Sequence, residues 1–263
     1  MIALSSRQLG VTTWTLPERG AAGLAWAHDA GFGRVHMDVR DVAIDGPDSL
    51  RVAAEELDIH LVGVAAVELE AVGIAGHDAE ACVSHAIELC SRLEIGYLYL
   101  PSFGAATISG ESDLQRTAEL LRHTISMAQP RGIVIATENT LRVDELPRLF
   151  EKVGQPSLEL LFDTQNPALL AQSAADIARA MAGRIRSFAH VKDGAESLGD
   201  RRLGDGIARV AESVDVILRG GFSGTFVLEN DYRGGDRRLA REDQERLLAM
   251  IRRADSDTDE LVS

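Results

Sequence analysis

The feature that most constrains the fold is an alternation of short apolar segments with longer segments of helical periodicity, repeated eight times along the chain. The apolar segments are rich in Val, Ile and Leu and cover residues 8–14, 34–39, 60–67, 97–103, 133–139, 158–164, 185–191 and 225–231. The helical segments cover residues 17–31, 49–58, 78–93, 112–129, 143–154, 167–183, 205–221 and 241–254. Strands that alternate with helices require right-handed crossovers, and near-continuous apolar strands indicate a parallel sheet covered on both faces.

Eight such units in 263 residues have the number and size of a (β/α)8 barrel, so we expect an α/β fold built as a single TIM barrel. The rival is an open doubly wound sheet, whose usual signature is a GxGxxG turn after the first strand; here that strand runs into TTWTLPERG. We see no linker and no short repeat, which favours one domain over residues 1–254. Residues 255–263 are acidic and lack apolar periodicity, and we expect them to form a disordered tail.

Charge and composition exclude some partners and compartments. The formal net charge is −14, which disfavours a general affinity for nucleic acid or for an anionic membrane. No apolar run has the length of a membrane-spanning helix, and the N-terminus lacks the pattern of a secretory signal, so we expect a cytoplasmic protein without a membrane partner. Cys82 and Cys90 lie eight residues apart in one helical segment, beyond disulfide reach, and are expected to be free thiols.

The candidate site consists of polar residues at the ends of four consecutive strands. The fifth expected strand ends with Glu138, the sixth with Asp163, the seventh with His190 and the eighth with Glu229. The active site of a TIM barrel lies at the C-terminal ends of its strands, so these side chains are expected to converge. Three carboxylates crowded in a dry site would repel one another, and a divalent cation resolves this repulsion. Oxygen and imidazole donors suit Mn²⁺, Mg²⁺, Co²⁺ or Zn²⁺, and the donor set itself does not decide between them. We expect one such ion and take Mn²⁺ as first choice.

The chain contains only two lysines, and one of them, Lys192, lies two residues after His190. Alternate residues of a strand point to the same face, so both side chains can serve one site. Lys192 would then contact a substrate oxygen or developing negative charge, or would pair with Asp193 or Glu229 and brace the ligands. The loop LGDG, residues 203–206, is expected to open the seventh helix, where it either receives an anionic group or forms a tight turn.

The second half of the chain resembles the xylose isomerase-like TIM barrels, a superfamily of sugar phosphate isomerases and epimerases, inosose-converting enzymes and family 2 AP endonucleases. The residues that carry the resemblance are ATENT, FDTQN, HVKDG, LGDG and GTFVLEN, with weaker support from GFGRVHMDV. The resemblance implies one divalent ion bound by Glu138, Asp163, His190 and Glu229. It also implies that Glu138 and Glu229 act as an acid/base pair, which moves a proton beside a carbonyl through a metal-stabilised enediolate. The implied activity is that of a sugar or keto-polyol isomerase or epimerase acting on a small carbohydrate-like molecule.

Several positions depart from the pattern of ketohexose epimerases. Asn166 and Glu196 stand where relatives carry histidine and arginine, and His36 stands where the second strand commonly ends with glutamate. These changes argue against a ketohexose 3-epimerase and leave the metal set intact. Candidate catalytic residues are Glu138, Glu229 and Lys192, and candidate substrate-binding residues are Trp14, His36, Arg40, Asn166 and Lys192.

Three other hypotheses for the function of the chain remain. A lyase would use the same site if loss of a β-hydroxyl followed deprotonation, as in inosose or dehydroshikimate dehydratases. A DNA-repair endonuclease of this fold would need three zinc ions and a histidine at the position of Asn166, and the acidic net charge also disfavours it. The last is a noncatalytic partner subunit, which an intact ligand set argues against. A homo-oligomer fits the Arg-rich stretch of residues 233–246, but a solvated helix explains it equally.

Overall fold

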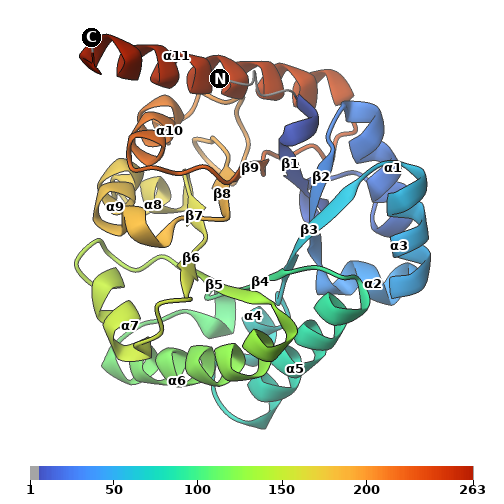
Figure 1. The fold of residues 1–263 in the computed structure, drawn as a ribbon, viewed down its shortest axis with the longest axis vertical. Helices are drawn as coiled ribbons and strands as arrows, with labels where there is room; N and C mark the ends of the chain where they lie inside the picture. The colour runs from blue at the N-terminus through green and yellow to red at the C-terminus, as the bar shows by residue number, and fades with distance from the viewer. Residues whose placement is uncertain (1–5, 263) are drawn as a thin grey trace.

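The computed structural model describes residues 6–262, with side chains described as far as Ala254. A ring of parallel strands forms the centre of the molecule, and helices surround it on the outside (Figure 1). The strands are β1 (Gly10–Thr12), β2 (Arg34–Asp38), β3 (His60–Ala65), β4 (Tyr97–Pro101), β5 (Val134–Glu138), β6 (Glu159–Leu160), β7 (Phe162–Asp163), β8 (Phe188–Val191) and β9 (Thr225–Leu228). They form one sheet in the order β6-β5-β4-β3-β2-β1-β9-β8-β7, which confirms the predicted TIM barrel.

The helices follow the strands as the alternation predicts. They are α1 (Gly20–Ala30), α2 (Val39–Asp45), α3 (Pro47–Glu56), α4 (Leu69–Val72), α5 (His77–Arg92), α6 (Glu111–Ala128), α7 (Leu146–Val153), α8 (Asn166–Leu169), α9 (Ala174–Met181), α10 (Val210–Arg219) and α11 (Arg237–Val262). Short 3-10 turns cover Ser6–Gln8, Thr13–Thr15, Gly104–Ala106, Gln129–Arg131 and Ala182–Arg184. Helix α11 packs on both α10 and α1 and so joins the last unit to the first (Figure 1).

The sixth strand is divided, which the sequence did not indicate. β6 pairs with β5, and β7 pairs with β8, with Leu161 between the two short strands. The Leu161 amide still donates to the carbonyl of Thr137 in β5, at 3.0 Å. The barrel is therefore nearly closed, and its one seam lies between β6 and β7.

Two expected helices differ from the structure. The segment 167–183 forms α8 and α9 with a break between them, and the segment 205–221 becomes helical only at Val210. The LGDG loop therefore does not open a helix directly. Helix α11 runs to Val262, and the expected disordered tail of residues 255–263 lies outside the described side chains and stays a prediction.

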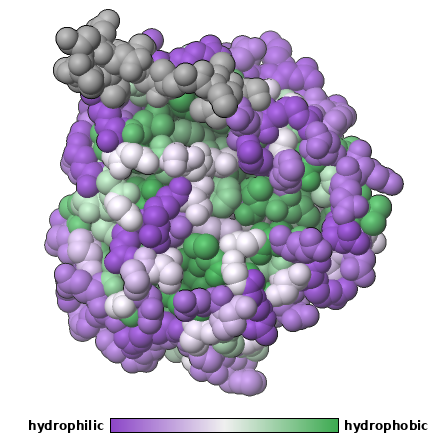
Figure 2. Space-filling model, in the orientation of Figure 1, coloured by the Kyte–Doolittle hydropathy of each residue, from purple (hydrophilic) through white to green (hydrophobic). Residues whose placement is uncertain are grey.

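The apolar side chains form two layers. The larger lies between the strands and the helices, and its fully buried members include Leu24, Leu98 and Leu121. A smaller cluster of Ala65, Tyr97, Tyr99, Ala136 and Leu161 fills the inside of the barrel. Hydrophilic side chains gather at the rim of the face in Figure 2 and hydrophobic ones toward its middle. Among the described residues no helix combines the length and apolarity needed to cross a membrane, and both cysteines are free thiols, as predicted.

Candidate active site

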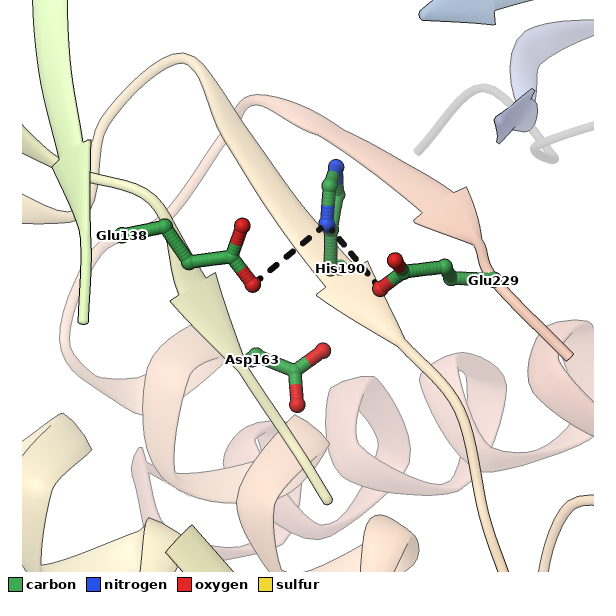
Figure 3. A group of neighbouring side chains, drawn as sticks. All are labelled: Glu138, Asp163, His190 and Glu229. Atoms are coloured by element: carbon green, nitrogen blue, oxygen red, sulfur yellow. Dashed lines mark ion pairs between the residues drawn. The ribbon is translucent and has the colours of Figure 1, made fainter. Parts of the chain in front are cut away.

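The four predicted ligand residues converge at the C-terminal ends of their strands. Glu138 and Asp163 end β5 and β7, His190 lies in β8, and Glu229 directly follows β9. One ligand atom from each lies within 4.8 Å of the others, and the side chains point toward one shared space (Figure 3). Glu138 and Asp163 are 5% exposed, His190 is fully buried and Glu229 is half-buried, so most of the cluster is shielded from solvent.

His190 links the carboxylates to the barrel interior. Its Nδ1 lies 3.2 Å from Glu229 Oε2 and 4.0 Å from Glu138 Oε1 (Figure 3). Its Nε2 lies 3.0 Å from Nδ1 of His36 in β2. One ring nitrogen of His190 therefore faces the cluster, and the other faces a second histidine.

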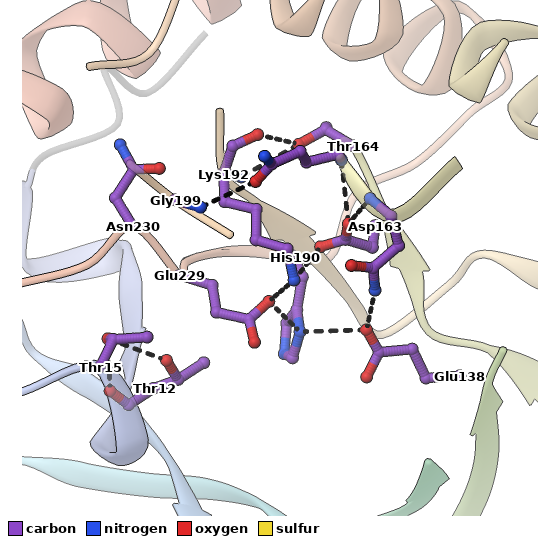
Figure 4. A network of polar contacts seen from close by, with 12 residues as sticks. Thr12, Thr15, Glu138, Asp163, Thr164, His190, Lys192, Gly199, Glu229 and Asn230 are labelled. Carbon is purple, nitrogen blue, oxygen red and sulfur yellow. Dashed lines mark hydrogen bonds and ion pairs between the residues drawn. The ribbon is translucent and has the colours of Figure 1, made fainter. Parts of the chain in front are cut away.

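Lys192 supplies a buried positive charge to the same cluster. Its Nζ lies 2.6 Å from Glu229 Oε2 and 3.2 Å from Asp163 Oδ2, and the residue is 2% exposed (Figure 4). Pairing with Glu229, one of the alternatives for Lys192, is therefore present, whereas Asp193 is held elsewhere by backbone amides. The other alternative, contact with a substrate oxygen, stays a prediction. Lys192 and His190 do point to one site, as their spacing indicated.

Neutral donors orient the three carboxylates. The Asn166 side-chain amide donates to Glu138 Oε1 at 2.9 Å, and the Trp14 indole N–H donates to Glu229 Oε1 at 2.8 Å. Asp163 Oδ1 accepts the backbone amides of Gln165 and Asn166 at 2.9 and 2.6 Å. These bonds hold one oxygen of each carboxylate in place; in Glu138 the bonded oxygen, Oε1, is also the one that faces His190.

The protonation of these groups follows from burial and from their neighbours. Burial raises the pKa of Glu138 to about 8 and also raises the pKa of Asp163. Burial alone would raise the pKa of Glu229, but Lys192 and His190 outweigh it and hold that pKa well below its usual value. Burial opposes the charge on Lys192, but the adjacent carboxylates of Asp163 and Glu229 raise its pKa. The cluster thus holds charges of both signs away from water.

A cavity of about 340 Å³ opens above the cluster. It is lined by Trp14, Thr15, Arg40, Val67, Glu70, Tyr99, Pro101, Phe103, Glu138, Asn166, Lys192, Leu198, Glu229, Asp231 and Arg233. Four of the five predicted substrate-binding residues are in this lining, and the exception is His36. Because His36 is fully buried behind His190, it reaches the site only through that residue.

The cavity mouth carries residues that the sequence reasoning missed. Arg233 lies just after the FVLEND segment, and its guanidinium pairs with Asp231 at 2.7 Å. Arg40 is likewise held by a carboxylate, that of the buried Asp38. Glu70 comes from α4, which was not expected, and burial raises its pKa. No strand-end pattern marked Glu70 or Arg233, because both lie in connecting segments.

The loop after β8 is organised around Asp193. Its carboxylate accepts the backbone amides of Gly204, Gly206 and Ala208 at 2.8 to 3.0 Å. A Cβ on Gly206 would lie 2.2 Å from Asp193 Oδ1, so glycine is required there. The amides of Gly204 and Gly206 are therefore taken by the chain's own Asp193 and are not free to receive an anionic group from outside, the first of the two alternatives. The loop does contain a turn, in which the Asp205 amide donates to the Arg202 carbonyl at 3.0 Å.

The residues present fit a divalent ion. Two buried cluster atoms, Asp163 Oδ2 and His190 Nδ1, have no hydrogen-bond partner among the described residues, although Asp163 Oδ2 lies 3.2 Å from Lys192 Nζ and His190 Nδ1 lies 3.2 Å from Glu229 Oε2. Buried polar atoms without partners are costly, and a cation would satisfy both. Glu138, Asp163, His190 and Glu229 together offer oxygen and imidazole donors, which suit several divalent metals and select none of them.

Known proteins resemble this chain in sequence over most of its length. The family model of the xylose isomerase-like TIM barrels matches residues 24–251. A relative from Actinoplanes sp. (strain ATCC 31044 / CBS 674.73 / SE50/110), named 2-epi-5-epi-valiolone 7-phosphate 2-epimerase, is 32% identical over 250 residues, which are 90% of this chain and 92% of the relative.

Solved structures share the fold. An L-ribulose 3-epimerase superposes with a TM-score of 0.78 at 17% identity, covering 97% of each chain. The IOLI protein, whose structure has a bound zinc atom, superposes with a TM-score of 0.68 at 13% identity, covering 95% of this chain and 96% of that one.

Proposed function

The chain belongs to the xylose isomerase-like TIM barrel family, and on that premise we propose that it is a divalent-metal-dependent epimerase of a polyhydroxylated ketone. The observation that carries the proposal is the placement of Glu138 and Glu229 on opposite sides of His190, in a buried cluster under the cavity (Figure 3). The substrate class comes from the Actinoplanes relative, whose name specifies a cyclic ketone phosphate.

The two glutamates would move the proton. Epimerisation next to a carbonyl needs one group to remove a proton from carbon and a group on the other face to return one. The hydrogen bonds from Asn166 to Glu138 and from Trp14 to Glu229 hold each carboxylate in one orientation, which keeps both within reach of a bound ketone.

Glu138, Asp163, His190 and Glu229 would hold the metal, with Mn²⁺ as first choice. When bound, a divalent ion would polarise the carbonyl and an adjacent hydroxyl and offset the negative charge that develops on their oxygens. Lys192 lines the cavity beside Glu229 and would place a second positive charge near those oxygens.

The cavity walls would exclude water and orient the substrate. Trp14, Tyr99 and Phe103 provide apolar surface on one part of the lining, and Arg40 and Arg233 provide polar contacts at another. A volume of about 340 Å³ falls at the small end of the range for ligand sites, which suits a single sugar-sized molecule.

The test is solvent deuterium incorporation into candidate ketones. Metal-reconstituted protein is incubated in D₂O with 2-epi-5-epi-valiolone 7-phosphate, with its dephosphorylated form, and with a ketohexose as a third arm. We expect one of the cyclic ketones to gain deuterium at the carbon beside the carbonyl and to yield an epimer, as read by NMR and mass spectrometry. A product lighter by one water would instead establish a lyase, and no exchange with any ketone would contradict the proposal.

Variants identify the groups that move the proton. Glu138→Gln and Glu229→Gln keep the side-chain shape and should each lower the exchange rate by about 10²- to 10⁴-fold, the usual contribution of general acid–base catalysis. Glu151→Gln, on the exposed surface of α7, is the matched control and should leave the rate unchanged. Full exchange in both site variants would rule out the glutamate pair.

A further inference from the structure

His36 occupies a space inside the barrel that is shaped for its ring. Its ring centroid lies 4.6 Å from that of Phe188 and 5.9 Å from that of Tyr97. On the neighbouring strand the residue in register is Gly63, where an added Cβ would lie 2.6 Å from His36 Nε2. Only a residue without a side chain at position 63 leaves room for this imidazole.

The hydrogen bond between His36 and His190 couples the tautomers of the two rings. A neutral imidazole carries its proton on one nitrogen and accepts at the other. The Nδ1 of His190 faces Glu229 and Glu138, and its Nε2 lies 3.0 Å from His36 Nδ1. If His190 offers the lone pair of Nδ1 to a metal, its proton must be on Nε2, and His36 must then accept that proton at Nδ1.

We propose that His36 is a positioning residue, which accepts the Nε2–H of His190 and so fixes the tautomer that aims Nδ1 at the carboxylate cluster. This inference rests on the proposed function, because it assumes that the cluster binds a metal. Ligating histidines generally donate their second N–H to a carboxylate, a carbonyl or water. Here the acceptor is the neutral ring of His36. It therefore adds no negative charge next to a cluster that already holds three carboxylates.

The surroundings of His36 keep it able to accept. His36 is fully buried among aromatic rings, and such surroundings disfavour a charged imidazole. Among the described residues no carboxylate forms an ion pair with His36, and its Nε2 has no hydrogen-bond partner. The ring is held in place by aromatic packing and by its hydrogen bond to His190.

Two variants separate positioning from packing. His36→Phe keeps the ring and removes the acceptor, whereas His36→Asn removes the ring and places an amide oxygen near the position of Nδ1. If His36 only fills space, His36→Asn should lose more metal affinity and more thermal stability than His36→Phe. If His36 positions His190, the Phe variant should lose metal affinity and the Asn variant should retain it, whatever happens to their unfolding temperatures.

The experiment measures the affinity of untagged, metal-stripped protein for Mn²⁺ and for Zn²⁺ by chelator competition. We expect His36→Phe to bind each metal about 10- to 100-fold more weakly than the wild type, and His36→Asn to stay within about 3-fold of it. Equal affinity of His36→Phe and wild type, or a weaker His36→Asn than His36→Phe, would overturn the inference.

A second measurement reads the tautomer directly. Two-bond ¹H–¹⁵N spectra of histidine-labelled, metal-free wild-type protein should show His36 protonated on Nε2 and hydrogen-bonded at Nδ1. A proton on Nδ1 of His36 would contradict the assignment. A wild-type protein that binds metal but epimerises nothing contradicts the proposed function alone, whereas a wild-type protein that binds neither metal overturns this inference as well.

Discussion

Replacing Lys192 with methionine should destabilise the metal-free protein far more than the metal-bound protein. The Lys192 ammonium is buried and lies 2.6 Å from Glu229 Oε2 and 3.2 Å from Asp163 Oδ2. Methionine fills a similar volume without the charge, so both carboxylates would lose a cation in a site that is largely buried. A divalent ion would bind the same carboxylates and compensate for the missing charge.

The magnitude follows from the burial of the pair. Removing one partner of a buried ion pair costs about 3–5 kcal/mol because the other charge stays buried and uncompensated. With a denaturant slope of about 3 kcal/mol per M of urea, the unfolding midpoint of metal-free Lys192→Met should fall by roughly 1 to 1.7 M. Metal also stabilises the wild type, so the difference between the two proteins narrows only as far as the variant, which lacks the competing ammonium, binds the ion more tightly. A Kd about 1,000-fold lower in the variant corresponds to about 4 kcal/mol and would recover most of the loss.

The assay is urea unfolding followed by the fluorescence of Trp14 and Trp26, in EDTA and in Mn²⁺. The chain offers a matched control, because its only other lysine, Lys152, forms an exposed ion pair with Glu111. Exposed pairs contribute little, so Lys152→Met should shift the midpoint only slightly in either condition. A Lys192→Met midpoint that matches the wild type in EDTA, or that is lowered equally with and without Mn²⁺, would refute the charge argument.

Three further outcomes are expected. Asp193→Ala leaves at least three backbone amides of its loop without an acceptor, so it should lower the free energy of unfolding by about 3 kcal/mol or more and speed hydrogen exchange in that loop; unchanged exchange would contradict this. Trp14→Phe removes the hydrogen bond to Glu229 and should lower kcat/KM roughly 10-fold, whereas an unchanged value would show that the indole only packs. Cys90 is buried and its pKa is raised to about 12 by burial, so Ellman's reagent at pH 8 should spare it in the folded protein and label it in urea; rapid labelling of folded protein would show that the thiol is reachable.

The residues that could be predicted are those whose position depends on local pattern. Glu138, Asp163, His190 and Glu229 each follow an apolar strand, and the C-terminal ends of parallel strands share one rim of a barrel. Knowing the strands was therefore enough to bring the four together, without any knowledge of the loops.

The features that could not be predicted depend on contacts between distant segments. The role of the LGDG loop depends on the carboxylate of Asp193, and the burial of His36 depends on the absent side chain at Gly63. The break at Leu161 reflects pairing with two different neighbours. None of these contacts leaves a periodic signal in the sequence. Each one joins residues of two separate elements, or two residues within the same loop.

The seam at Leu161 divides the two proposed proton-transferring carboxylates. Glu138 belongs to the β5 side, whereas Asp163, His190 and Glu229 belong to the continuous ladder of β7, β8 and β9. Across the seam the ring is completed by the covalent chain, by hydrogen bonds from Ser187 to Glu159 and by one from Asn166 to Glu138. We expect the spacing between the two glutamates to tolerate change at this seam, so substitutions at Leu161 or Asn166 offer a way to adapt it to ketones of different width while leaving both glutamates in place.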